Sequence, residues 1–279
     1  MNLTAFVDGL EARAKESIKA EQGDYEIDGL LYCHKCNTPK QTRVEFLGVV
    51  KTPMCLCKCE VEKREREEAE RKRIEFEKKI NENRRIAFPE SQMQYWTFAN
   101  DDKSNEKIST VARNYADKFE VMREQAKGLL LFGSVGTGKT YIGACIANAL
   151  LDRGYPVLMT NFARLSNTLQ GMWEGKQEYL DSLNRFPLLI IDDLGAERKS
   201  EYMNEIVYHL IDSRYRARLP LIVTTNLSSD ELKNPTDITN QRTYSRLLEM
   251  CVPIKVEGKD RRREKLKDSF GEIGQLLGL

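Results

Sequence analysis

The sequence predicts an α/β fold with a parallel, doubly wound sheet, and three observations predict it. Residues 133–140 read Gly-Ser-Val-Gly-Thr-Gly-Lys-Thr, the G-x-x-x-x-G-K-T pattern, between an apolar run at 128–132 and a helical pattern at 141–151. Apolar strands and helical segments then alternate towards the C-terminus. Polar residues follow several of these strands at their carboxyl ends, where ligands bind in open α/β sheets.

Composition excludes several classes of protein. The chain has 279 residues, of which 41% are hydrophobic and 31% charged, and a net charge of +1 from 44 basic and 43 acidic residues. Any contact with nucleic acid must therefore come from local patches. We expect a cytoplasmic protein with no membrane contact, because neither a signal peptide nor an apolar run of roughly 18 residues is visible.

Residues 1–60 are predicted to form a small N-terminal domain that binds a partner. Its first residues have helical spacing, and Cys33-His-Lys-Cys36 and Cys55-Leu-Cys57-Lys-Cys59 follow. With the alternating segment 41–50 as a hairpin strand, these cysteines resemble a zinc ribbon, whose metal replaces a missing core. We predict Zn²⁺ ligation by Cys33, Cys36, Cys57 and Cys59, with Cys55 as the alternative ligand. Unmetallated thiols are the competing interpretation.

His34 and the two cysteines outside this region are interpreted as structural residues. His34 lies inside the first cysteine pair and is interpreted as a bystander. Cys145 and Cys251 fall in predicted core elements and are interpreted as ordinary buried cysteines.

Residues 61–94 are predicted to be a charged helical linker. The run 58–85 holds 11 basic and 9 acidic residues, many of them as Glu-to-Lys or Glu-to-Arg pairs four residues apart. This near balance favours a solvated helix over a nucleic-acid-binding one. Phe88-Pro89 should end the helix.

Residues 95–279 are predicted to form the nucleotide-binding domain. An aromatic cluster at 95–100 either packs at the edge of the nucleotide site or caps the core, and 104–125 has the spacing of one helix. The predicted strands are 129–132, 157–160, 187–193, 220–226 and 252–256. The main predicted helices are 141–151, 200–218 and 239–250, with further helical segments around a polar break at 171–176.

The glycine-rich loop has the chemistry of a site for ATP. Gly133, Gly136 and Gly138 let the backbone aim N–H groups at phosphate oxygens, and the following helix N-terminus favours anions. Lys139 should reach the β- and γ-phosphates, and the Thr140 hydroxyl should bind Mg²⁺. The predicted nucleotide-binding residues are Gly133, Ser134, Val135, Gly136, Thr137, Gly138, Lys139, Thr140, Tyr141 and Asp192.

Two acids end the strand at 187–193, in the pattern of a Walker B element. Asp192 is predicted to hold Mg²⁺ together with Thr140. Asp193 is predicted to orient or deprotonate the attacking water, with Glu197 as an alternative. An Asp is shorter than the more usual Glu, so we expect slow hydrolysis. Asn226, with Thr225 as the second choice, is predicted to sense the γ-phosphate or align the water.

Several arginines complete the predicted site. Arg246, in Tyr-Ser-Arg-Leu-Leu, is predicted to reach a γ-phosphate bound by a neighbouring subunit, which requires self-association. Arg242 and residues 261–263 are the other notable basic residues of this part of the chain. Residues 261–263 are weak candidates for a second arginine that senses the phosphate. Residues 255–267 hold seven basic and three acidic residues, and they form either a phosphate-contacting patch or a solvated helix.

Four motifs together resemble the DnaC/DnaI/IstB group of AAA+ ATPases. They are Gly-Ser-Val-Gly-Thr-Gly-Lys-Thr, Leu-Leu-Ile-Ile-Asp-Asp-Leu-Gly-Ala-Glu, Ile-Val-Thr-Thr-Asn-Leu and Tyr-Ser-Arg-Leu-Leu-Glu. The resemblance implies an AAA+ fold without a C-terminal lid domain. It also implies that Asn226 is sensor 1 and that Arg246 is the arginine finger.

The resemblance implies a role in DNA replication and a bacterial or phage-encoded protein. Members of this group load replicative hexameric helicases onto single-stranded DNA or assist transposases. We expect an ATP-hydrolysing helicase loader that self-associates on binding ATP. The alternative is an IstB-like transposition helper that binds duplex DNA and a transposase. A module that holds ATP as a structural switch and a small-molecule kinase are further alternatives.

Overall fold

The computed structural model describes residues 20–46, 48–195, 201–235, 237–261, 263 and 277. The chain divides into two compact units, Met1–Glu77 and Lys78–Leu279. The predicted helix at the start of the chain, Glu197 and Arg262 lie outside the described residues. In the part of the chain described here, no helix has both the length and the apolarity needed to cross a membrane.

The first unit contains two antiparallel hairpins. Strand β3 (Val44–Phe46) pairs with β4 (Val49–Lys51). The segment 41–50, predicted as one strand of a hairpin, therefore contains a turn and parts of both strands, and Gly48 has the positive φ, 76°, that the turn requires. Strand β1 (Tyr25–Ile27) pairs with β2 (Leu30–Tyr32), a hairpin that was not predicted. Its signal is the dipeptide Asp28-Gly29, which supplies the two positive φ angles, 52° and 74°, that a tight hairpin turn requires.

A buried carboxylate holds the first unit together beside the hairpins. Asp24 accepts hydrogen bonds from Lys40 Nζ at 2.6 Å and from the backbone N–H of Glu21 at 2.8 Å. His34 Nδ1 lies 3.0 Å from the same carboxylate. The Lys40 ammonium is the main reason why the pKa of Asp24 falls well below its usual range. His34 therefore has a structural partner, which agrees with its interpretation as a bystander.

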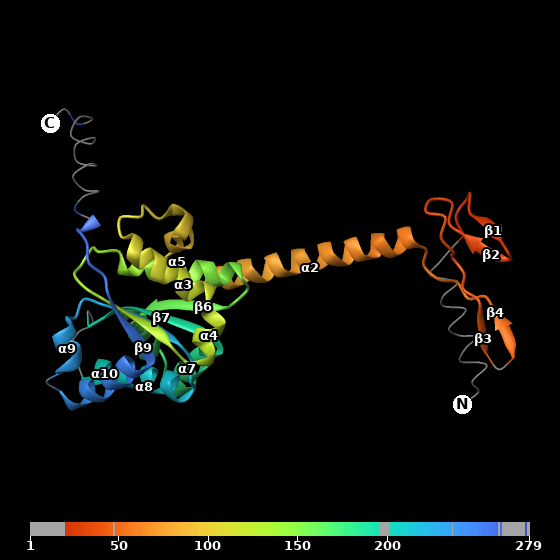
Figure 1. Cartoon of the computed structure of the whole chain (residues 1–279). Helices are drawn as coiled ribbons and strands as arrows, with labels where there is room; N and C mark the ends of the chain where they lie inside the picture. Colours follow the sequence, from red (N-terminus) through yellow and green to blue (C-terminus); the bar gives the residue numbers. More distant parts are fainter. Residues whose placement is uncertain are drawn as a thin grey trace. The chain divides into compact units, whose positions relative to one another are not determined.

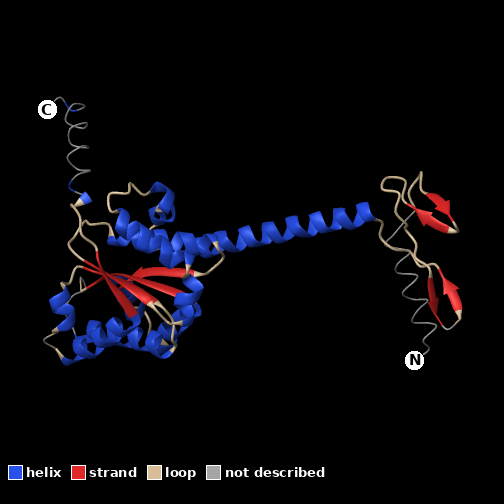
Figure 2. Cartoon of the chain, in the orientation of Figure 1, coloured by secondary structure: helices blue, strands red, loops and turns tan. Residues whose placement is uncertain are grey.

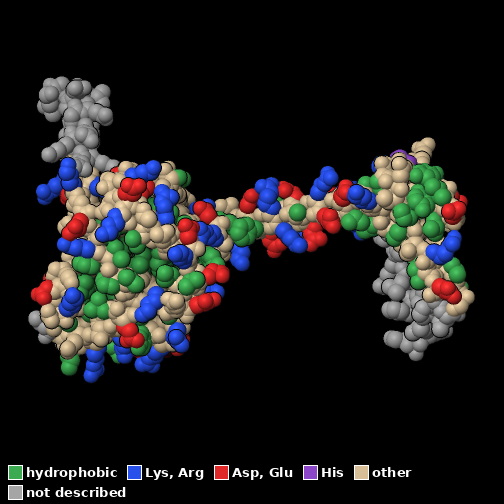
Figure 3. Space-filling view, viewed as in Figure 1, with side chains coloured by type: hydrophobic (Ala, Val, Ile, Leu, Met, Phe, Trp, Pro, Cys, Tyr) green, Lys and Arg blue, Asp and Glu red, His purple; other side chains and the backbone are tan. Residues whose placement is uncertain are grey.

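Helix α2 (Lys58–Ala87) is the predicted charged helix, and the boundary between the two units falls within it. Side chains of both signs alternate along its surface (Figure 3). Lys72 Nζ lies 2.7 Å from Glu68 and Arg64 Nε lies 3.7 Å from Glu60, both as i,i+4 pairs. The helix ends directly before Phe88-Pro89, as predicted.

The segment before the sheet differs from the prediction in one respect. After the 3₁₀ turns η1 (Ser91–Tyr95) and η2 (Phe98–Asn100), the single helix expected over 104–125 is two helices, α3 (Glu106–Asp117) and α4 (Phe119–Glu124). The chain leaves helical geometry at Lys118, where φ is −101° and ψ is 22°. The break allows Phe119 to be buried against Tyr155, with ring centroids 5.2 Å apart.

The second unit is built around five parallel strands in the order β6-β7-β8-β5-β9. The strands are β5 (Gly128–Phe132), β6 (Val157–Asn161), β7 (Leu188–Leu194), β8 (Leu221–Thr225) and β9 (Cys251–Lys255). All five lie where the sequence predicted them, within a residue or two. Figure 2 shows this sheet in red between layers of blue helices.

Helices cover both faces of the sheet, so the fold is doubly wound as predicted. Helices α3 and α5 (Lys139–Asp152) lie on one face, and α8 (Glu201–Arg216) and α10 (Ile238–Met250) on the other (Figure 1). The second face also carries α6 (Phe162–Gln170), α7 (Lys176–Ser182), η3 (Leu183–Arg185) and α9 (Ser229–Lys233). Alternate residues of β5 enter the two cores: Leu129 and Leu131 pack with α5, and Leu130 packs with α8. Cys145 and Cys251 are buried, as predicted.

Arg214, on α8, is fully buried, a feature that the sequence did not predict. Its guanidinium donates to the carbonyl of Phe186 at 2.8 Å and to that of Pro220 at 2.5 Å. Burial lowers its pKa to about 9. These bonds tie α8 to the residues that precede β7 and β8, so they fix the two strands whose far ends form the candidate site.

Candidate functional site

The glycine-rich loop connects β5 to α5 at the carboxyl edge of the sheet. Gly138 is the N-cap of α5, with φ of 94°, and provides no side-chain acceptor for the first amides of the helix. Gly133 has φ of 148°, and a Cβ there would lie 2.3 Å from the Val256 carbonyl oxygen. These glycines allow the tight turn that presents backbone N–H groups and a helix N-terminus, which together bind phosphate.

Lys139 connects the loop to the end of a different strand. Its ammonium donates to the Gly133 carbonyl at 2.9 Å, to the Ser134 carbonyl at 2.8 Å and to Asn226 Oδ1 at 2.8 Å. The side chain is buried, and Asn226 directly follows β8. The predicted phosphate-binding lysine and the predicted γ-phosphate sensor are therefore hydrogen-bonded neighbours.

Thr140 and Asp192 meet across the site. The Thr140 hydroxyl donates to Asp192 Oδ2 at 3.1 Å, and the Thr224 hydroxyl donates to Asp192 Oδ1 at 2.6 Å. Burial raises the pKa of Asp192, and the nearby charge of Asp193 raises it further. A hydroxyl and a buried carboxylate that converge in this way, with a second carboxylate beside them, fit a site for Mg²⁺, which prefers oxygen ligands.

Asp193 lies at a bulge in β7. The pairing of β7 with β8 shifts between Ile191 and Leu194, and Asp193 adopts φ of 56°. Its backbone N–H donates to the Thr224 hydroxyl at 2.9 Å, and its side chain is half-buried. This left-handed conformation is sparsely populated by non-glycine residues and often accompanies functional sites.

Thr224 was not predicted as a site residue, although its hydroxyl bonds the Asp192 carboxylate and the backbone N–H of Asp193. Its signal in the sequence is a polar side chain within the apolar strand 220–226. The neighbouring Thr225, the second choice for the sensor, donates its hydroxyl to the Leu194 carbonyl at 2.6 Å. Thr225 therefore fastens the end of β8 to β7, and Asn226 is the residue that reaches Lys139.

Two further predicted residues contact segments that flank the loop. The Tyr141 hydroxyl donates to the Thr97 carbonyl at 3.0 Å, and its ring lies 5.8 Å from that of Trp96. Arg261 donates its backbone N–H to the Gly136 carbonyl at 3.1 Å, and its guanidinium lies 3.4 Å from Asp102. The segment after β9 therefore rests against the loop.

Arg246 lies on α10, and its contacts among the described residues are with α8 rather than with the loop. Its Nη1 forms an ion pair with Asp212 Oδ1 at 2.8 Å. Arg242, one turn earlier, is exposed. The structure thus holds Arg246 at the α8–α10 face and does not add it to the hydrogen-bonded group around Lys139.

The first unit contains the predicted cysteine cluster. The Sγ atoms of Cys33, Cys36, Cys57 and Cys59 all lie within 4.8 Å of one another. Two of the distances are 3.6 Å, between Cys33 and Cys59, and 3.3 Å, between Cys57 and Cys59. Tetrahedral Zn²⁺ with bonds of about 2.3 Å would separate its sulfurs by about 3.8 Å.

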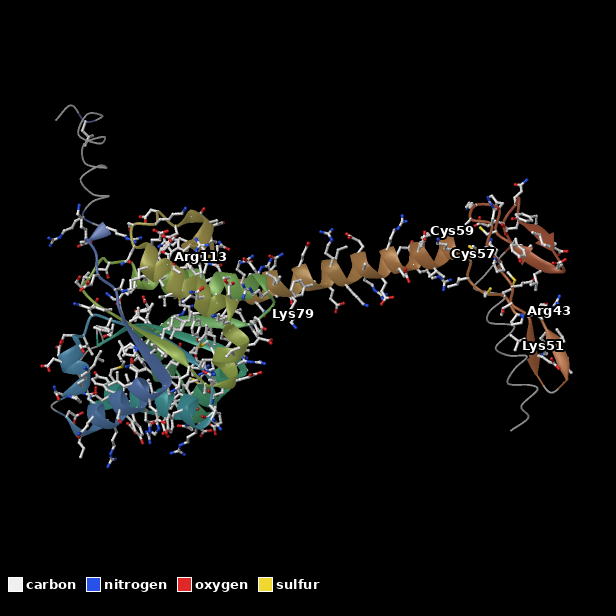
Figure 4. The ribbon with its side chains drawn as sticks, in the orientation of Figure 1. Arg43, Lys51, Cys57, Cys59, Lys79 and Arg113 are labelled. Carbon is white, nitrogen blue, oxygen red and sulfur yellow. The ribbon has the colours of Figure 1, made fainter. Side chains whose placement is uncertain are left out.

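The chemistry of the cluster also fits a cation. Hydrogen bonding to the Thr38 hydroxyl lowers the pKa of Cys36 to about 5, and the bond with the neighbouring Cys57 thiol is the main cause that raises the pKa of Cys59 to about 12. A bound metal ion would stabilise all four thiolates together. Cys57 and Cys59 lie at the start of α2 (Figure 4). Cys55, the alternative ligand, lies outside the cluster, and its thiol faces the Pro39 carbonyl at 3.6 Å.

Comparison with known proteins gives consistent results. Residues 63–269 match the family described as IstB-like ATP binding protein. The chain is 28% identical over 206 residues to the replicative helicase loader DnaI of Bacillus subtilis, covering 68% of this chain and 66% of the relative. It is 28% identical over 140 residues to the replicative helicase loader DnaC of Escherichia coli, covering 49% of this chain and 55% of the relative.

A crystal structure of DnaI resembles the same part of the chain. The TM-score is 0.54 at 27% identity, covering 64% of this chain and 98% of the crystallised one. The chain spans less than two thirds of the full length of the two helicase loaders that it matches in sequence.

Proposed function

The chain belongs to the IstB-like ATP-binding protein family, and within that family we propose that it is an ATP-dependent loader of a replicative hexameric helicase. The observation that carries this proposal is the similarity to the replicative helicase loader DnaI over 206 residues. The arrangement of Lys139, Asn226, Thr140 and Asp192 supports ATP as the nucleotide whose binding drives the cycle.

The positions of the site residues support a role for each. The loop amides and Lys139 bind the β- and γ-phosphates, and Asn226 holds the lysine in place from the end of β8. Thr140 and Asp192 would hold Mg²⁺, which neutralises charge on the phosphates. Asp193 orients the attacking water and accepts its proton.

Replacing Asp193 with asparagine is expected to lower the steady-state rate of ATP hydrolysis by about 100-fold while leaving ATP affinity within about twofold, because a general base is lost and the phosphate contacts remain. Phosphate release and binding of a fluorescent ATP analogue measure the two quantities. Asp117→Asn, at an exposed acid on α3, is the matched control. Equal, near-zero turnover in wild type and Asp193→Asn would instead favour a module that only binds ATP.

Loading of a helicase requires self-association of the chain, and Arg246 can act between two copies. We assign Arg246 to the γ-phosphate bound by a neighbouring copy of this chain, so that hydrolysis responds to self-association. The assembly would engage single-stranded DNA and the helicase. The first unit, with its zinc-binding cluster, would bind the helicase.

The test of the proposed function is whether the chain co-elutes with a replicative hexameric helicase in size-exclusion chromatography, with light scattering to give the mass of the complex. We expect the full chain to form a complex, and residues 78–279 alone to lose it, since the helicase-binding unit is removed. Runs with and without ATP show whether the nucleotide controls the complex. Absence of a complex under all conditions, combined with binding to duplex DNA, would favour the IstB-like transposition helper.

A further inference from the structure

Arg246 makes more contacts that restrict its side chain than an arginine on a helix surface usually makes. Its Cζ lies 5.0 Å from the centroid of the Tyr208 ring and 5.7 Å from that of the Tyr215 ring. Its Nη1 lies 2.8 Å from Asp212 Oδ1, and 27% of the side chain remains exposed. Two aromatic faces and a carboxylate, all from α8, therefore fix a long side chain that would otherwise sample many rotamers.

The carboxylate that fixes it is itself buried and paired. Asp212 is 7% exposed. Its Oδ2 lies 2.8 Å from Arg216 Nε, so its two oxygens face two different arginines. The two arginines differ in exposure: the Arg216 side chain is 75% exposed, and that of Arg246 is 27% exposed. Arg216 thus lies on the solvent side of Asp212, and Arg246 lies on the side where α8 packs against α10.

The geometry leaves part of the Arg246 guanidinium available. A guanidinium has five N–H donors in a planar fork, and the ion pair with Asp212 uses the Nη1 edge. Two hollows adjoin at Tyr208 on the same face, with volumes of about 570 and 510 Å³. The second is lined by Arg242 and Arg246, so an anionic group seated there would meet two cations.

We infer that Asp212 and Tyr208 are positioning residues for Arg246: they hold its guanidinium on the α8–α10 face so that its free edge meets a phosphate bound by a second copy of this chain. The inference rests on the proposed role of Arg246 in the neighbouring site. Pre-organisation removes most of the entropy cost of ordering the arginine when two copies meet. The ion pair with Asp212 adds an electrostatic attraction that holds the guanidinium on this face.

The test measures ATP turnover per subunit of the full chain as a function of protein concentration. Asp212→Asn is expected to lower the plateau kcat by about 10-fold with KM changed by less than about twofold, as is usual when a group that orients a catalytic side chain is lost. Arg246→Ala should lower the plateau at least as much. The double variant should equal Arg246→Ala, because Asp212 acts only through Arg246. Arg216→Ala, which removes the other partner of Asp212, is the matched control and should keep the wild-type plateau.

Tyr208 gives a second, independent arm. Tyr208→Ala removes the ring that faces the guanidinium, and it should lower the plateau rate to the same degree as Asp212→Asn. This arm decides the question if thermal melting shows that Asp212→Asn does not fold. Binding of a fluorescent ATP analogue to dilute protein should be the same for all folded variants, since the positioning group does not touch the chain's own nucleotide site.

The outcomes distinguish the role of Arg246 from that of Asp212 and Tyr208. If Arg246→Ala keeps the wild-type plateau, the proposed action of Arg246 in the neighbouring site is wrong, and the inference fails with it. If Arg246→Ala is impaired but Asp212→Asn and Tyr208→Ala are not, the positioning inference alone is overturned. An Asp212→Asn effect of equal size in the Arg246→Ala background would also overturn it.

Discussion

Replacing Lys139 with alanine is expected to lower kcat/KM for ATP hydrolysis by more than about 100-fold, because one buried donor aimed at developing charge is commonly worth that much. The residue is buried, and its ammonium is already directed by two loop carbonyls and Asn226. Phosphate release and equilibrium binding of ATP measure the effect.

The control for this substitution is Lys127→Ala. Lys127 lies just before β5, and its ammonium also donates to a carbonyl, that of Glu249, at 2.6 Å. The Lys127→Ala variant therefore loses a comparable hydrogen bond, at the end of β5 opposite the loop. Wild-type turnover in Lys127→Ala and loss in Lys139→Ala is the expected pair of results. Equal turnover in both variants, with both folded by thermal melting, would remove Lys139 from the site.

Replacing Cys57 with serine is expected to abolish stoichiometric Zn²⁺ and to unfold the region around the cysteine cluster. A structural zinc site of this kind contributes about 10 kcal/mol or more to the folding of a small domain, and loss of one thiolate removes most of it. The second hairpin of the first unit buries little apolar surface, because Val44, Val49 and Val50 are all exposed. Metal analysis and limited proteolysis measure the two effects.

Cys55→Ser is the matched control, since Cys55 is two residues away and lies outside the cluster. It should retain the metal and its resistance to protease. Both variants should hydrolyse ATP at the wild-type rate, because the loop and its partners belong to the other unit. Loss of zinc in Cys55→Ser and its retention in Cys57→Ser would contradict the ligand set.

Much of the fold and site follows from the sequence because the signals are local. Strands of four or five apolar residues, a glycine-rich loop and acids at a strand end are each visible within about ten residues. Their common position at one edge of the sheet is then a consequence of parallel strands. The cysteine pairs were visible for the same reason, although the choice between Cys55 and its neighbours needed the three-dimensional arrangement.

The remaining features depend on register between distant segments, which no local pattern contains. Thr224 bonds both acids of β7 only because β8 lies beside β7 with a bulge at Asp193. Arg214 has the sequence context of an ordinary charged helix residue, yet it is fully buried beneath β7 and β8. The break at Lys118 was likewise invisible, because helical spacing continues on both sides of it.

Helicase loading onto closed circular single-stranded DNA is the direct assay of the proposed function. Displacement of an annealed oligonucleotide by the helicase reports the loaded rings. We expect the full chain with ATP to increase displacement well above the level of helicase alone, and Lys139→Ala to leave it at that level. Displacement that is the same with and without the chain, under conditions where the chain binds ATP, would show that the chain is not a loader of that helicase.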